Sequence, residues 1–71
     1  MYFILMARCS MDDLPLGIYS TLDSAKTAAA EVTDEDIDQA RDAMMTGESE
    51  FICLAILEFW GGKPHNIRVL D

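Results

Sequence analysis

The stretch FICLAILEFW, residues Phe51 to Trp60, decides the fold of this chain. Nine of its ten residues are apolar, it contains no Gly or Pro, and Gly61-Gly62 follows it directly. An apolar run of this length, rich in β-branched and aromatic residues, is typical of a central strand rather than of a surface helix. A strand that is apolar on both faces needs a cover on each side.

Three further strands are predicted around this run. Tyr2–Cys9 is a second, nearly continuous apolar segment and predicts a second central strand. Leu14–Tyr19 is shorter and carries Pro15 near its start, which places it at a sheet edge because proline cannot donate to the strand ladder. His65–Leu70 follows the turn at Gly61-Gly62-Lys63-Pro64 and predicts the last strand.

The segment between the two strand pairs has the features of helices. Ser20 with Asp23 three residues later approximates a capping box and predicts a helix over Leu22–Glu31. Thr33, followed by three acidic residues, predicts a second helical start, and Gly47 fits a left-handed C-terminal cap. The pattern leaves open whether this is one kinked helix or two. The residues expected to face the sheet are Leu22, Ala25, Ala29, Val32, Ile37, Ala40 and Met44.

Together these segments predict one compact α+β domain over residues 1–71 in the order ββααββ. If the helical crossover passes over the first strand, the four-stranded antiparallel sheet has the order 2-1-3-4. One or two helices then pack on one face of this sheet.

Side-chain alternation divides each central strand into two faces. We expect the alanine-rich helices to pack over small residues, which places Ala7, Cys9, Cys53 and Ala55 beneath them. The opposite, uncovered face would then be apolar apart from two charged residues that could pair across strands. The residues expected on this uncovered face are Ile4, Met6, Arg8, Ile52, Leu54, Ile56, Glu58 and Trp60.

An uncovered apolar face of this size exceeds what monomeric proteins usually expose. We therefore expect it to be an interface, most simply in a two-fold homodimer. The other possibility is that the last strand and the C-terminus curl over it. Chains this short bury a modest share of their surface, which also favours oligomerisation.

The formal charge is −8, from five Lys and Arg against thirteen Asp and Glu. This balance argues against direct binding to DNA, RNA or an anionic membrane, because such binding needs cationic contacts. It suits a soluble protein, and it is also compatible with an inhibitor that mimics nucleic acid in the groove of a basic partner. The acidic surface that would serve such mimicry is formed by Asp23, Glu31, Asp34, Glu35, Asp38 and Asp42.

The sequence predicts no catalytic, cofactor-binding or metal site. The acidic run at Asp34–Asp38 fails the EF-hand pattern, because Gln39 and Met45 occupy the positions that require Gly and Glu. His65 is the single histidine and has no zinc-ligand spacing around it. The cysteines, Cys9 and Cys53, lie within apolar runs and are expected as buried thiols, with a bond between them as the alternative.

Two expectations on site and location follow from composition. A small-molecule site between sheet and helices would need an apolar pocket with convergent polar groups, and few polar residues fall in the predicted core. The longest apolar runs are far shorter than the ~20 residues of a membrane span, and no basic region precedes the first, so a cytoplasmic location is expected. The chain is thus predicted to be a small, non-catalytic protein-interaction domain that homodimerises through its uncovered sheet face.

Overall fold

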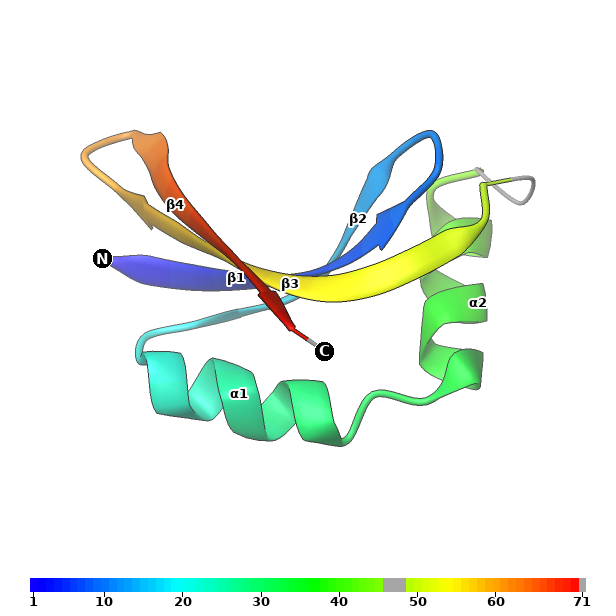
Figure 1. Cartoon of the computed structure of the whole chain (residues 1–71), viewed down its shortest axis with the longest axis horizontal. Helices are drawn as coiled ribbons and strands as arrows, with labels where there is room; N and C mark the ends of the chain where they lie inside the picture. The colour runs from blue at the N-terminus through cyan, green and yellow to red at the C-terminus, as the bar shows by residue number, and fades with distance from the viewer. Residues whose placement is uncertain (46–48, 71) are drawn as a thin grey trace.

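A computed structural model describes residues 1–45 and 49–70 and has four strands and two helices (Figure 1). The elements are β1 (Tyr2–Cys9), β2 (Asp13–Tyr19), α1 (Leu22–Ala30), α2 (Asp34–Ala43), β3 (Phe51–Trp60) and β4 (Lys63–Leu70). All strand pairs are antiparallel and the sheet order is β2-β1-β3-β4. The predicted α+β fold, its ββααββ order and its strand order are confirmed.

Each helix begins at a threonine whose side chain caps the first turn. Thr21 Oγ1 accepts a hydrogen bond from the Ser24 amide at 3.1 Å, so the cap of α1 lies one residue after the predicted Ser20. The α2 cap is at the predicted Thr33, whose side chain accepts from the Asp36 amide while the Asp36 carboxylate accepts from the Thr33 amide. This reciprocal pair satisfies two donors that the helix itself leaves unpaired.

The two helices are separate, because α1 ends at Ala30 and Thr33 starts a new cap in extended conformation. After the end of α2, Met45 has a φ of 57°, a left-handed conformation that is usually adopted by glycine. The predicted cap residue Gly47 lies outside the described residues.

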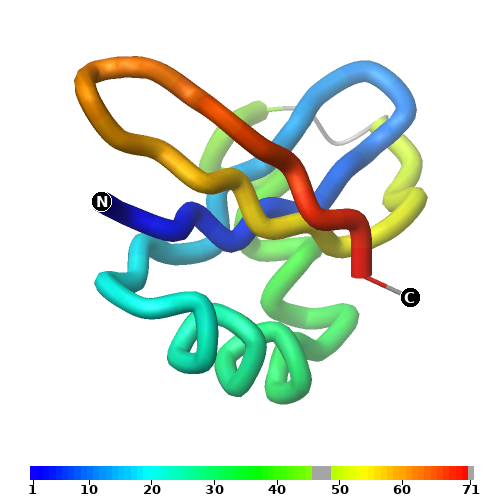
Figure 2. The backbone as a smooth tube through the Cα atoms, turned by 60° about the vertical axis from the view of Figure 1, so that its left-hand side comes forward, coloured from blue at the N-terminus to red at the C-terminus, as the bar shows by residue number. Residues whose placement is uncertain are grey.

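Both helices lie on one side of the sheet (Figures 1 and 2). The helix α1 runs beneath the sheet and α2 stands at one end of it, while the two hairpins, β1–β2 and β3–β4, bend away from α1. The strand register shifts at Leu5/Met6, at Arg8/Cys9 and at Glu58/Phe59. Such irregularities bend a strand and increase its twist, which accounts for the curvature of the sheet.

The buried core lies between sheet and helices in two clusters. The first joins Leu5 and Ile56 of the sheet to Ala25 and Ala29 of α1. The second joins three strand residues to the side chain of Ile37 in α2. Its strand members are Ala7, Cys9 and Leu14. The helix positions were predicted correctly except for Met44, which is 53% exposed.

The predicted faces are right for β1 and wrong for β3. Leu5 pairs with Ile56 and Ala7 pairs with Leu54, and directly paired residues of antiparallel strands share a face. Leu54 and Ile56 therefore lie beneath the helices, whereas Ala55 lies on the other side. The reason is volume: helix faces made of alanine leave space that large strand residues fill at native packing density.

The two cysteines lie on opposite faces of the sheet. Cys9 is buried on the helix side, and its thiol donates to the Ala7 carbonyl oxygen, with 3.7 Å between sulfur and oxygen. Cys53 pairs with Arg8 and so points to the other side, contrary to the expected placement of Cys53 beneath the helices. Both are free thiols, and their opposite orientation excludes a bond between them.

A polar anchor joins the β1–β2 turn to the segment before β3. Ser49 is 2% exposed, and its hydroxyl accepts a hydrogen bond from the Met11 amide at 3.1 Å. Its carbonyl oxygen accepts from Arg41 of α2 at 3.0 Å, and the Glu50 amide donates to the Ser10 hydroxyl at 3.0 Å. These bonds fix the chain at the entry to the central strand.

Candidate functional site: the open face of the sheet

The side of the sheet that faces away from the helices is the candidate functional site, and we call it the open face. The residues of the open face are identified from the strand register. Directly paired residues lie on the same side of the sheet, and consecutive residues of a regular strand lie on opposite sides. Its members are Tyr2, Ile4, Met6, Arg8, Asp13, Pro15, Ile18, Cys53, Ala55, Leu57, Phe59, Pro64, Ile67 and Val69.

The open face is apolar at its centre and at both edges. At the centre Met6 and Ala55 are 8% and 0% exposed. Toward the edges exposure rises to 67% for Ile18 and 58% for Val69. Large apolar side chains left in water at both edges of one surface are typical of an interaction site.

The open face is also hollow. In Figure 1 and Figure 2 both hairpins rise on the side opposite the helices, so this face forms the inside of a V. Each register shift leaves one residue without a partner on the neighbouring strand. Leu16 is such a residue, between Pro15 and Gly17, and the strand bends there.

Of the eight residues predicted for this face, Ile4, Met6 and Arg8 lie on it. Leu54 and Ile56 are in the core beside the helices, and Glu58 shares their side because it pairs with Phe3. The last two residues lie at the ends of β3. Ile52 is 65% exposed at the register shift, and Trp60 stacks on His65 at the hairpin turn with ring centres 3.4 Å apart.

Five further large apolar residues of the open face were not predicted there, namely Ile18, Leu57, Phe59, Ile67 and Val69. Apolar residues at alternate positions in the last strand, Ile67 and Val69, were a usable signal, because their partners are Leu57 and Ala55 of β3. The alternation of apolar and polar residues in an edge strand indicates which side of the neighbouring strand is apolar. It does not indicate which side of the sheet the helices cover.

Up to residue 70, the last one that the structure describes, the C-terminal segment does not cover the open face. Through Leu70 the chain remains paired with β3 as the fourth strand, and Leu70 itself packs against the core on the helix side. The alternative that the last strand curls over the apolar face is therefore wrong for the described residues.

Charge is divided between the two sides of the molecule. On the open face Arg8 and Asp13 neutralise each other, with Nε and Oδ1 3.4 Å apart. The expected partner of Arg8, Glu58, lies on the opposite side. The predicted acidic residues lie in the helical layer and are exposed; they are Asp23, Glu31, Asp34, Glu35, Asp38 and Asp42. Among them Asp38 forms an ion pair with Arg41.

The described residues offer little for metal chemistry. Across residues 1–45 and 49–70, no three His, Cys, Asp or Glu side chains lie close enough together to hold a metal ion. His65 is exposed in β4, and its Nε2 lies 2.9 Å from the Trp60 carbonyl oxygen. In the same part of the chain, neither helix has the length and apolar character needed to cross a membrane.

The fold and this surface define a class of protein: a small α+β domain in which two helices cover one face of a curved antiparallel sheet. Comparison of the chain with protein-family models, curated proteins and solved structures found no match. Its function is therefore inferred from its own surfaces.

Proposed function

We propose that this protein is a non-catalytic protein-interaction domain that pairs with a second copy of itself through the open face. The observation that carries the proposal is the exposure of Ile18, Val69, Ile67 and Tyr2 around a neutral, hollow apolar surface. Removing these side chains from water is favourable at about 25 cal/mol per Å² of apolar area.

Charge favours a second copy as the occupant. The net charge of −8 opposes self-association in most orientations, since acidic surfaces would meet. Contact through the open face places both helical layers, with their acidic residues, on the outside of the pair. The contact surfaces carry the internally neutralised Arg8–Asp13 pair, so little charge repulsion opposes their approach.

Shape favours an orthogonal arrangement of the two sheets. Twisted sheets that pack face to face do so either nearly aligned or at about 90°. With the V of one copy turned across the V of the other, the hairpins of each copy flank the centre of its partner.

The size of the open face predicts weak pairing. Four strands about 4.8 Å apart, with about seven residues of about 3.3 Å each, span roughly 440 Å² in projection. Stable interfaces bury about 800 Å² of accessible surface on each partner, so we expect a dimer of micromolar affinity.

Sedimentation velocity over a micromolar concentration series tests the proposal, with Ile18→Lys as the disrupting variant. Met44→Lys is the control, because Met44 is a large apolar residue that is 53% exposed at the end of α2, in the helical layer and away from the open face. We expect the wild type and Met44→Lys to dimerise as concentration rises and Ile18→Lys to remain monomeric. A wild type that is monomeric at tens of micromolar refutes the proposal, as does equal disruption by both variants.

A second candidate function, mimicry of nucleic acid, is favoured by a separate observation. Glu35, Asp38 and Asp42 are exposed on successive turns of α2 and extend the charge of its first turn along the helix. If this surface occupies the groove of a basic nucleic-acid-binding protein, the immobilised domain should capture that protein, and duplex DNA should compete with the domain for it. The double variant Glu35→Lys with Asp42→Lys should then capture nothing. Capture that persists in high salt and against excess DNA excludes this candidate.

A further inference from the structure

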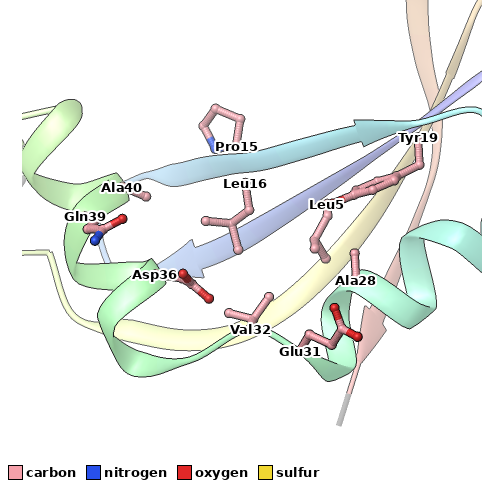
Figure 3. A pocket seen from close by; sticks show the side chains of 10 residues that line it. All are labelled: Leu5, Pro15, Leu16, Tyr19, Ala28, Glu31, Val32, Asp36, Gln39 and Ala40. Atoms are coloured by element: carbon pink, nitrogen blue, oxygen red, sulfur yellow. The ribbon is translucent and has the colours of Figure 1, made fainter.

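A cavity of about 500 Å³ lies on the helix side of the sheet, in the angle between α1 and α2 and beneath β2 (Figure 3). In Figure 3, Leu5 and Leu16 project from the strands toward the helices, and Val32 lies across from them in the connection between α1 and α2. Leu16 and Val32 pack against both core clusters, so the cavity occupies the place where the two clusters meet.

The cavity exists because small helix residues face it. Ala28 of α1 and Ala40 of α2 line its two sides, and the single methyl group of an alanine fills little of the space between helix and strand. The phenol ring of Tyr19 closes the end near the start of α1. Its volume is within the range of about 300 to 1,000 Å³ found for small-molecule sites.

The polar groups of the cavity are anionic or neutral. Glu31, at the end of α1, and Asp36, in the first turn of α2, line it together with the amide of Gln39. Asp36 Oδ2 accepts the Thr33 amide at 2.9 Å, which fixes the carboxylate in place while its other oxygen has further acceptor capacity. Of the ten described lining residues, none is Lys, Arg or His.

We propose that this cavity binds an organic ammonium ion with an aromatic or branched apolar body. The apolar body fills the space between Leu16, Val32 and Ala40, and the ammonium group donates a hydrogen bond to the carboxylate of Glu31, with Asp36 as a second anionic group of the lining. Charge-assisted hydrogen bonds of this kind are the stronger ones, and two carboxylates with no lining cation select a cation over its neutral or anionic isostere. The site is distinct from the open face, because Pro15, beside the register shift in β2, is the one described residue that belongs to both surfaces.

Amide NMR shifts with three probes of matched shape test this proposal: phenethylammonium, phenethyl alcohol and 3-phenylpropionate. We expect saturable shifts at Ala28, Val32 and Ala40 with the amine, at millimolar concentration, and much smaller shifts with the alcohol and the carboxylate. Glu31→Gln should raise the dissociation constant about two- to fivefold, the range of a partly exposed ion pair. Glu35→Gln removes the same charge from an exposed position that does not line the cavity, and should leave binding unchanged.

Filling the cavity provides the second arm of the test. Ala28→Leu should abolish the saturable shifts while the protein remains folded by circular dichroism, and Ala40→Leu serves if the first variant does not fold. Ala30→Leu is the control, because Ala30 is exposed on α1 and does not line the cavity. Absence of saturable shifts with the amine in the wild type overturns the proposal. So does equal binding of the carboxylate, or equal weakening by Glu31→Gln and Glu35→Gln.

Discussion

Truncation of Ile56 tests the assignment of the two faces of β3. Ile56 is 1% exposed and packs against Ala25 and Ala29 of α1. Ile56→Ala removes three carbons, which is worth about 2.4 kcal/mol of transfer free energy at ~0.8 kcal/mol each. The short alanine side chains above cannot fill the vacated volume, so a cavity term of up to about 2 kcal/mol adds to this loss. We expect the free energy of unfolding to fall by about 2.5 to 4.5 kcal/mol.

This loss is large for a chain of 71 residues, whose whole stability is about 7 kcal/mol at ~0.1 kcal/mol per residue. Urea unfolding followed by far-UV circular dichroism measures it, at protein concentrations low enough to keep the open face unpaired. The control is Ile67→Ala, since Ile67 is 45% exposed on the open face and its loss should be about 1 kcal/mol. If Ile67→Ala destabilises as much as Ile56→Ala, the sides of β3 are wrongly assigned.

Three local features give further predictions. Met45→Gly should raise the unfolding free energy by about 0.5 to 1 kcal/mol because φ is 57° there, whereas Met44→Gly at φ −94° should give no gain in the same denaturation assay. Ser49→Ala should lower the unfolding free energy by about 1 to 2 kcal/mol, because the Met11 amide loses its hydrogen-bond acceptor. Ser20→Ala, at an exposed site, should lower it by less than about 0.5 kcal/mol. His65→Ala should change the fluorescence of the single tryptophan, on which the imidazole stacks, while far-UV circular dichroism stays constant; unchanged emission would contradict the stacking.

The sequence predicts the elements and their order because apolar runs, turn residues and capping residues are local signals. The boundaries of β1 and β3 and the cap at Thr33 match those signals closely. The side of β3 that faces the helices was not predictable in this way, since a strand with a single charged residue has nearly the same polarity on both faces. Side-chain volume decided it, because alanine-rich helices accept Leu54 and Ile56 better than Cys53 and Ala55.

The candidate site was predictable as a surface but not as a list of residues. Chain length alone indicates that two short helices cannot cover both sides of four strands. The register shifts near Ile52 and His65 and the pairing of the edge strands decide which residues belong to that surface. None of these follows from one strand considered alone, because register is a property of a pair.

The open face and the cavity beneath β2 have one cause in common. The helical layer consists of helices of nine and ten residues, and alanine makes up much of its inner surface. Such a layer lies close to the sheet where Ala25 and Ala29 meet Leu5 and Ile56, but it cannot fill the angle between its own helices. It also leaves the other side of the sheet without any cover from the described chain. A larger residue in the helices would close the cavity and leave the open face as it is, so the two surfaces can be altered separately.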